Sequence, residues 1–265
     1  MVLAKDELYH YWGKANRSDA NAPPASHLLP YHCLDVAAVA AYWWDHAPAL
    51  RKSFSQKENQ AEYRGWLLFF IALHDLGKWD IRFQAKCWRA WEALNSVTSG
   101  KNAIGKTWDH GQGGLYWFKQ DFDQDSDYDG AFITHSLHPK EKWFPWVEAV
   151  TGHHGYIYQH INLTTSDLAL SVQLKLQGER DKKARLAWLD ALAVLFLHPI
   201  GLSLDDNPPS CSSLLAGFCS ISDWLGSWNS EETFQFQSTP EPLHDYYSRR
   251  YAVDAPIVMK LSGLL

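Results

Sequence analysis

Histidine and aspartate stand side by side at the end of an apolar run, in FFIALHDLGKWD at residues 69–80. The run is typical of a buried helix, so we expect His74 and Asp75 at the end of a core element. Imidazole and carboxylate groups suit divalent metal ions. Adjacent helical residues diverge by about 100°, so both side chains reach one site only at the helix end or along its edge. Gly77 supplies a turn there. Lys78, four residues after His74 and on the same helical face, can contact a phosphate or an acidic neighbour.

A metal site at this point needs ligands from other segments. The candidates lie at helix ends or on apolar faces, and they are His32, His110, the pair His153-His154, and Asp223. Glycines adjoin three of the histidines, in DHGQGG and GHHG. Asp223 lies within the apolar stretch LAGFCSISDWLGS, where a carboxylate is costly to bury unless it is paired or binds a metal.

The elements that must position these groups are predicted to be helices. Apolar residues recur at helical spacing in six segments, 33–50, 61–75, 113–122, 140–155, 179–199 and 210–228. Pro48 and Pro199 mark two helix ends, and serines at the start of the last segment are candidate caps. The best strand candidate is TFQFQ at 233–237. The pattern predicts an all-α fold.

The totals favour one globular domain. The chain has 265 residues, 46% of them apolar, and this length buries roughly three quarters of the unfolded chain's surface. We expect a single domain over 1–265, with 229–265 as a C-terminal extension packed on it. No apolar run is typical of a membrane span or a signal peptide, so the expected location is the cytoplasm, with no membrane partner. The four cysteines are expected to be buried free thiols.

The net charge of −6 argues against a strong autonomous grip on nucleic acid, because that grip comes mainly from cationic neutralisation of phosphates. It leaves room for a nucleic-acid substrate that a partner delivers. Most of the 14 tryptophans are expected in the core, while some can line a groove that stacks bases.

One apparent motif is rejected. GKNAIGKT at 100–107 satisfies the phosphate-loop pattern, but such a loop must follow a strand and open a helix. Neither context is present, so we interpret the segment as a polar loop.

Five segments in order resemble a known family: YHCLDVAAVA, FIALHDLGKWD, DHGQGGLYWF, AVTGHHG and AGFCSISDWLGS. They are similar to the HD superfamily of metal-dependent phosphohydrolases, and most similar to the HD nuclease domain of the helicase-nucleases of type I CRISPR systems, subtype I-E. HYWGK at 10–14 belongs to this resemblance, which covers nearly the whole chain. It implies an HD-domain helical bundle with a metal site between helices.

The resemblance also implies roles for individual residues. The first of two divalent ions would be held by His32, His74, Asp75 and Asp223. The second would be held by His110, His153 and His154, with Asp75 bridging. Asp75 and Lys78 would act in catalysis, Lys78 as a phosphate contact, while Ser227 matches a family serine whose role stays open.

The implied reaction is two-metal hydrolysis of single-stranded DNA with little sequence preference. Histidine-rich ligation favours manganese, iron, cobalt or nickel, with magnesium as the alternative. The implied partners are a helicase domain or chain and the RNA-guided surveillance complex of CRISPR interference. The chain ends at LSGLL, about where the helicase begins in the family, so we expect any motor to come from another chain.

Two other functions stay open: an HD phosphohydrolase acting on nucleotides, and a non-catalytic module that docks on the surveillance complex. The complete ligand set argues against the second. The remaining histidines considered are assigned structural roles: His27, His46, His135, His138, His160 and His198. Asp35 is either a hydrogen-bond partner of a ligand imidazole or an exposed helix carboxylate.

Overall fold

The prediction of a helical fold is confirmed. The computed structural model describes residues 7–16, 25–54, 59–95, 108–122, 140–156 and 172–265. The α-helices in these ranges are α2 (Leu29–His46), α3 (Pro48–Phe54), α4 (Gln60–Ile71), α5 (Ile81–Gln84), α6 (Trp88–Asn95), α7 (His110–Phe122), α8 (Phe144–Thr151), α10 (Val172–Leu192), α11 (Leu215–Gly226), α12 (Leu243–Arg249) and α13 (Ala255–Leu261). Short 3₁₀ turns are η1 (Glu7–His10), η2 (Leu76–Lys78), η3 (Ala85–Cys87), η5 (Lys140–Lys142) and η7 (His198–Ile200), and π-helical turns are η6 (Ala193–Leu197) and η8 (Arg250–Asp254).

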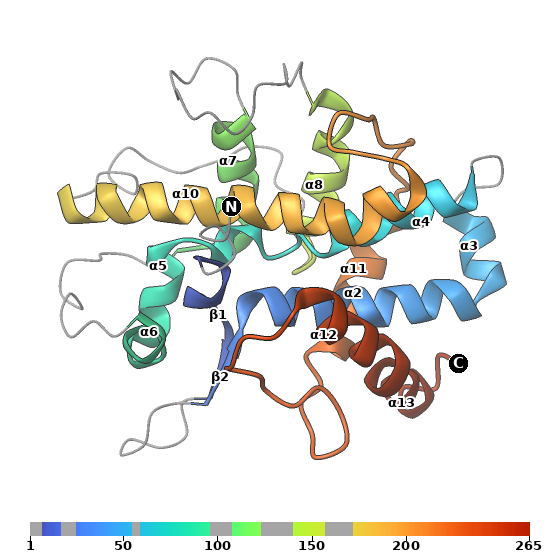
Figure 1. Cartoon of the computed structure of the whole chain (residues 1–265). Coiled ribbons are helices and arrows are strands. Elements are labelled where there is room, and N and C mark those ends of the chain that lie inside the picture. Colours follow the sequence, from blue (N-terminus) through green and yellow to red (C-terminus); the bar gives the residue numbers. More distant parts are fainter. Residues whose placement is uncertain (1–6, 17–24, 55–58, 96–107, 123–139, 157–171) are drawn as a thin grey trace.

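Helix α2 is the central element. It contacts α4, α11, α12 and α13, and Figure 1 shows it running through the molecule with α12 and α13 beside it. Its middle is rich in alanine and fully buried, so neighbouring backbones approach closely. At Gly226 of α11 a Cβ would lie 2.8 Å from the backbone nitrogen of Val36. Small residues on both helices therefore bring α11 directly against α2.

The core is aromatic, as the tryptophan content predicts. The largest fully buried side chains include Trp44, Trp66, Trp79, Trp143, Trp146 and Trp188. Their rings meet at centroid distances that favour aromatic packing, such as 5.4 Å between Trp66 and Trp143. Trp224 and Trp228, near the end of α11, are exposed instead.

The strand prediction at 233–237 is wrong. In the described ranges the strands are β1 (Trp12–Ala15) and β2 (Ser26–Leu28), which pair antiparallel. Residue Gln237 reaches β2, since its carbonyl accepts from the Leu28 N–H at 3.0 Å. Its own N–H is taken by His27 Nδ1 at 2.9 Å, so the pairing does not extend into a ladder.

Helix boundaries depart from the predictions at three places. Helix α10 begins at Val172, before the predicted start, and Pro199 lies inside η7 rather than after a helix end. The predicted serine caps of α11 are wrong, because its N-cap is Leu214 and makes no side-chain cap bond. Pro48 opens α3 in addition to ending α2.

Several predictions fall outside the described residues, namely those on 100–107, His135, His138 and His160. The segment 229–265 carries α12 and α13, both packed on α2. Within the described ranges, no helix combines the length and apolarity that a bilayer crossing requires.

Candidate metal centre

Two histidines lie in turns that follow helix C-termini, and both turns are built alike. Helix α4 ends at Ile71, and His74 Nδ1 lies 2.9 Å from the Ile71 carbonyl oxygen. Helix α8 ends at Thr151, and His153 Nδ1 lies 2.7 Å from the Val150 carbonyl oxygen. The last carbonyls of a helix lack intrahelical partners, so they accept from these imidazoles. A carbonyl can only accept, so Nδ1 carries the proton and the lone pair of each Nε2 faces the centre.

Asp75 and Lys78 lie in a tight turn, which corrects one expectation. The chain leaves α4 before His74 and forms the 3₁₀ turn η2, so Lys78 does not share a helical face with His74. Instead, Lys78 Nζ contacts Asp75 Oδ2 at 2.6 Å. Of the two expected partners, the structure shows the acidic neighbour.

Gly77 has a steric role rather than the conformational one that we expected. Its φ is not positive. A Cβ there would lie 1.9 Å from the carbonyl oxygen of His110, the first residue of α7. Trp108 Nε1 also donates to the Gly77 carbonyl at 2.9 Å. Only glycine lets the start of α7 approach the turn this closely, and this contact brings His110 to Asp75.

One group of candidate ligands comprises His32, His74 and Asp223, whose ligand atoms lie within 4.8 Å of one another. His32 Nε2 is 3.4 Å from Asp223 Oδ1 and 3.0 Å from Asp75 Oδ2. Ser227 Oγ donates to Asp223 Oδ1 at 3.0 Å, which defines a role for this serine. Helices α2 and α11 and the turn after α4 supply this group.

The second group comprises His110, His153 and His154, again within 4.8 Å. His110 Nε2 and His154 Nε2 are 2.9 Å apart. Asp75 Oδ1 is 3.4 Å from His110 Nε2 and 4.0 Å from His153 Nε2. The two oxygens of Asp75 therefore face different groups, which is the geometry of a bridging carboxylate.

The protonation states suit metal binding. Burial holds the pKa of His32 and of His110 well below the usual range, and burial lowers the pKa of His153 to about 4. Burial alone would raise the pKa of Asp75, but its contacts with His74, Lys78 and His32 outweigh burial and hold the pKa well below its usual value. These imidazoles are thus neutral and the carboxylate ionised at neutral pH, as metal ligands must be.

The residues present fit a divalent ion. In the described part of the chain, five buried atoms that face the centre make no hydrogen bond: His32 Nε2, His74 Nε2, His153 Nε2 and both carboxylate oxygens of Asp75, of which Oδ2 is in ion-pair contact with Lys78. Burying polar atoms without partners costs on the order of 1–3 kcal/mol each. Metal coordination removes that cost. Cys33 is also near His74 and Asp75, but burial raises the pKa of its thiol well above the usual value, which disfavours a thiolate ligand.

The structure brings all seven sequence-identified candidate ligands into one place. It adds a residue that we did not single out, Lys14 of β1, whose Nζ is 3.9 Å from Asp223 Oδ1. Burial and the neighbouring Lys78 charge lower the pKa of Lys14. The only signal in the sequence was its place in HYWGK, a short segment without periodicity.

Both expectations for Asp35 are wrong. It is fully buried, and it bonds no candidate ligand. Its Oδ2 lies 2.8 Å from His27 Nε2, its Oδ1 accepts from Tyr246 Oη at 2.8 Å, and Arg250 Nε lies 3.2 Å from Oδ1. His27 Nδ1 accepts from Gln237, so the His27 proton is on Nε2. We call these four side chains, His27, Asp35, Tyr246 and Arg250, the Asp35 network.

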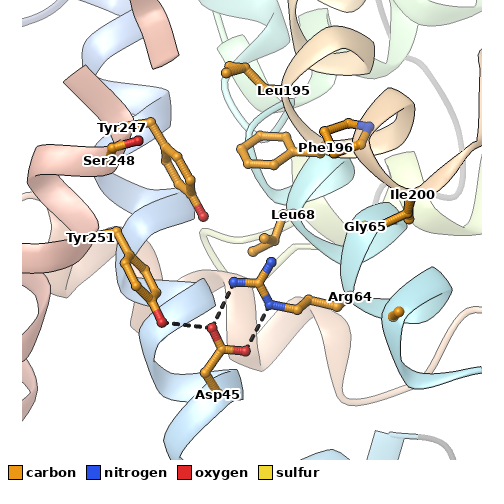
Figure 2. A pocket seen from close by; sticks show the side chains of 12 residues that line it. Asp45, Arg64, Gly65, Leu68, Leu195, Phe196, Ile200, Tyr247, Ser248 and Tyr251 are labelled. Carbon is orange, nitrogen blue, oxygen red and sulfur yellow. Dashed lines mark hydrogen bonds and ion pairs between the residues drawn. The ribbon is translucent and has the colours of Figure 1, made fainter. Parts of the chain in front are cut away.

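A pocket of about 520 Å³ lies elsewhere, between the end of α2, the first half of α4, η6, η7 and α12 (Figure 2). None of the candidate ligands lines it. Arg64 donates to both oxygens of Asp45, at 2.8 and 2.7 Å, and Tyr251 Oη donates to Asp45 Oδ2 at 2.9 Å. The charges in the pocket wall therefore satisfy one another.

The chain is similar to CRISPR-associated proteins. The family model described as "Cas3, HD domain" matches residues 12–231. The "CRISPR-associated endonuclease/helicase Cas3" of Escherichia coli (strain K12) is 46% identical over 270 residues, which cover 97% of this chain and 30% of that protein. The chain thus spans less than a third of the length of this relative.

Solved structures share the fold. The crystal structure of T. fusca Cas3 matches with a TM-score of 0.64 at 19% identity, over 97% of this chain and 27% of that one. The Thermus thermophilus cas3 HD domain in the presence of Ni²⁺ matches with a TM-score of 0.57 at 19% identity, over 98% of this chain and 91% of that one. A chain of a pre-nicking CRISPR RNA-guided surveillance complex matches with a TM-score of 0.61 at 18% identity, over 96% of this chain and 29% of that one.

Proposed function

Because this chain belongs to the Cas3 HD-domain family, we propose that it is a metal-dependent nuclease that hydrolyses phosphodiester bonds of single-stranded DNA in CRISPR interference. The observation that carries the proposal is the convergence of seven candidate ligands from five separate segments, with unpartnered buried atoms on His32, His74, Asp75 and His153. Structural ion pairs do not need so many unpartnered atoms, whereas a metal centre does.

Two divalent ions fit the two groups. His32, His74, Asp75 and Asp223 would hold one, and His110, His153 and His154 would hold the other, with Asp75 shared. Nitrogen-rich ligation favours manganese, iron, cobalt or nickel over magnesium. When bound, such ions activate a water and stabilise the attacking and leaving oxygens of the phosphodiester.

The chain's own residues prepare this chemistry. The helix-end carbonyls fix the tautomers of His74 and His153, and Ser227 orients Asp223. Lys78 keeps Asp75 ionised and in place across a 2.6 Å contact. These contacts fix the ligand atoms before any ion or substrate binds, which reduces the reorganisation needed for reaction.

The proposed substrate and partners follow from the relatives. The Escherichia coli relative is named an endonuclease/helicase, so we propose that a helicase domain or chain delivers the strand. We further propose that recruitment depends on an RNA-guided surveillance complex. Trp224 and Trp228 are exposed directly after Asp223 and Ser227 in sequence, and their rings are available to stack bases. A single domain over 1–265 and a cytoplasmic location stay predictions.

A cleavage assay tests the proposal. With manganese or cobalt, the chain should cut circular and linear single-stranded DNA and leave blunt duplex nearly untouched, because a net charge of −6 gives it little hold on duplex. Chelation should abolish cleavage. Efficient cutting of linear duplex without a helicase would contradict the single-strand preference. Hydrolysis of nucleotides without cleavage of DNA would favour a nucleotide phosphohydrolase instead.

A further inference from the structure

The N-terminal hairpin forms one wall of the metal centre. Residues Trp12 to Lys14 belong to β1, and the β1–β2 register is irregular between Trp12 and Lys14. At Gly13 a Cβ would lie 2.7 Å from His32 Cβ, so the strand backbone lies directly against a candidate ligand. Lys78 Nζ also donates to the Gly13 carbonyl, at 3.4 Å.

A buried glutamine fixes this strand in place. Gln84 Oε1 accepts from the Trp12 N–H at 3.0 Å, and Gln84 Nε2 donates to the Trp12 carbonyl at 3.1 Å. The same Nε2 donates to the Lys78 carbonyl at 2.9 Å. One fully buried amide thus ties β1 to the turn that carries Lys78, and it holds the backbone from which Lys14 extends.

The two lysines of the centre are used differently. Lys78 is engaged, since its Nζ is 2.6 Å from Asp75 Oδ2 and 7% of its side chain is exposed. Lys14 Nζ is 3.9 Å from Asp223 Oδ1, beyond hydrogen-bond length, and 33% of its side chain is exposed. Among the residues that the structure describes, no hydrogen bond of Lys14 Nζ is recorded, so its donors have capacity there for an anion that enters from solvent.

The balance of charges in the centre also favours an anion contact for Lys14. Without ions, two lysines face two carboxylates, Asp75 and Asp223. Divalent ions beside these carboxylates repel both ammonium groups. Lys78 is confined by burial, whereas Lys14 is long, flexible and partly in solvent, so it can turn toward a negative group at the mouth of the centre.

We propose that Lys14 is a phosphate-binding residue of this centre, whose ammonium contacts a non-bridging oxygen of the scissile phosphate. The inference rests on the proposed nuclease function and adds a contact from the N-terminal hairpin. Charge-assisted contacts to phosphate are stronger than neutral ones, and they gain in a partly buried site.

The test compares Lys14→Met with Lys14→Arg, using Lys52→Met as the matched control. Lys52 is an exposed lysine of α3, which lies at the opposite end of α2 from β1 (Figure 1). In manganese, Lys14→Met should lower kcat/KM on single-stranded DNA on the order of 10- to 100-fold. Lys14→Arg should keep most of the activity because it keeps the charge, and Lys52→Met should match the parent.

A binding measurement supplies a second readout. The affinity for a hydrolysis-resistant phosphorothioate single strand is measured against salt concentration by fluorescence anisotropy. Loss of one phosphate contact should reduce the slope of log K against log salt by about 0.7 in Lys14→Met and leave it unchanged in Lys52→Met. Bound manganese, measured by elemental analysis, should equal that of the parent.

The outcomes separate this inference from the proposed function. A parent chain that neither binds nor cuts single-stranded DNA overturns both. A parent that cuts, with a Lys14→Met variant that equals it in rate and in salt slope, overturns the inference alone. So does a Lys14→Met variant that loses manganese in proportion to activity, because Lys14 then merely supports Asp223.

Discussion

Two buried clusters that contain histidine and aspartate lie along α2, and they differ in how far their hydrogen bonds are completed. In the metal centre, His32 Nε2, His74 Nε2 and Asp75 Oδ1 make no hydrogen bond among the described residues. In the Asp35 network, one turn further along α2, both oxygens of Asp35 and both ring nitrogens of His27 have partners. Histidine and aspartate occur in both. What separates the candidate metal centre from the Asp35 network is that the protein itself completes the hydrogen bonds of the Asp35 carboxylate and the His27 ring, whereas those of Asp75 and His32 stay open in the described residues.

The two clusters also join different parts of the chain. In the metal centre, atoms without hydrogen-bond partners on several side chains face one point. The Asp35 network ties the C-terminal segment, through Gln237, Tyr246 and Arg250, to β2 and α2. Substitutions in the first should therefore cost activity, and substitutions in the second should cost stability.

The largest effect is expected for Asp75→Ala. Asp75 faces both groups of histidines, so cleavage should fall on the order of 10⁴-fold or more while the fold survives. His74→Ala should behave likewise. The measurement is the single-stranded DNA cleavage rate, alongside circular dichroism of the metal-free protein. If Asp75→Ala keeps substantial activity, then the two clusters do not differ in their importance for cleavage.

The next effect concerns the number of ions. Replacing His153 and His154 together by alanine should lower bound manganese from two ions per chain toward one, since the group around His32 remains. Activity should fall about 10³-fold, because one ion cannot stabilise both the attacking and leaving oxygens. Metal stoichiometry by elemental analysis gives the count. If the double variant keeps the parent's metal stoichiometry and cleavage rate, then the GHHG segment ends a helix and binds no ion.

Asp35→Ala should have the opposite effect to these substitutions, since it should lower stability and leave activity unchanged. It leaves the buried Tyr246 hydroxyl and His27 Nε2 without the Asp35 carboxylate, and Arg250 keeps Asp254 as its carboxylate partner, so the free energy of unfolding should drop by about 3 kcal/mol. Cleavage by the folded fraction should be unchanged. Urea unfolding measures the first quantity. Asp245→Ala, exposed on α12 beside Tyr246, is the control and should change stability by less than about 0.5 kcal/mol. Lost metal binding in folded Asp35→Ala would show that the clusters are coupled.

Part of the pH dependence of the stability of the metal-free chain should come from His153 in the metal centre. The pKa of His153 falls from 6.5 to about 4 on folding, chiefly through burial. The folded state therefore disfavours the protonated imidazole, and its contribution is present above about pH 6.5 and is lost as the pH falls toward 4. The loss should be roughly 3 kcal/mol. Urea unfolding of the parent and of His153→Gln between pH 4 and 7 measures this loss. If the free energy of unfolding depends on pH with the same slope in both proteins, the prediction is contradicted.

The smallest effect is expected at the pocket. Asp45→Asn weakens an ion pair with Arg64 in which the two side chains are 28% and 33% exposed. Solvent screens such a pair, so stability should fall by less than about 1 kcal/mol, and Tm by about 2 °C. Differential scanning calorimetry checks this. If Asp45→Asn lowers stability as much as Asp35→Ala does, then the exposure of an ion pair does not determine how much its loss destabilises the protein.

Long periodic elements and the ligand set could be predicted from the sequence, whereas their local supports could not. The helices around His32, His74 and Asp223 follow from apolar spacing, and the order of the motifs predicts the candidate ligands that the structure brings together. The supports depend on contacts between distant residues. Gln84 holding Trp12, and Gln237 meeting His27, leave no periodic signal in a single sequence.

The errors have the same origin. TFQFQ alternates like a strand, yet the imidazole of His27 takes the N–H that a ladder would need. Asp35 has the spacing of an exposed helix carboxylate, yet residues more than 200 positions away cover it. Lys14 lies in a four-residue strand whose place is set by a glutamine on α5. In each case tertiary contacts outweigh local pattern.

The spread of the ligands along the chain has a consequence for synthesis. Asp223 and the helix that carries it leave the ribosome about 190 residues after His32. At roughly 5–20 residues per second, on the order of ten seconds or more separate the two. Until α11 docks through Gly226 on α2, the candidate ligands around His32 lack the Asp223 carboxylate. A nascent chain that has not reached α11 therefore carries the histidines without the complete candidate metal centre, and under the proposed function it would not yet cut nucleic acid.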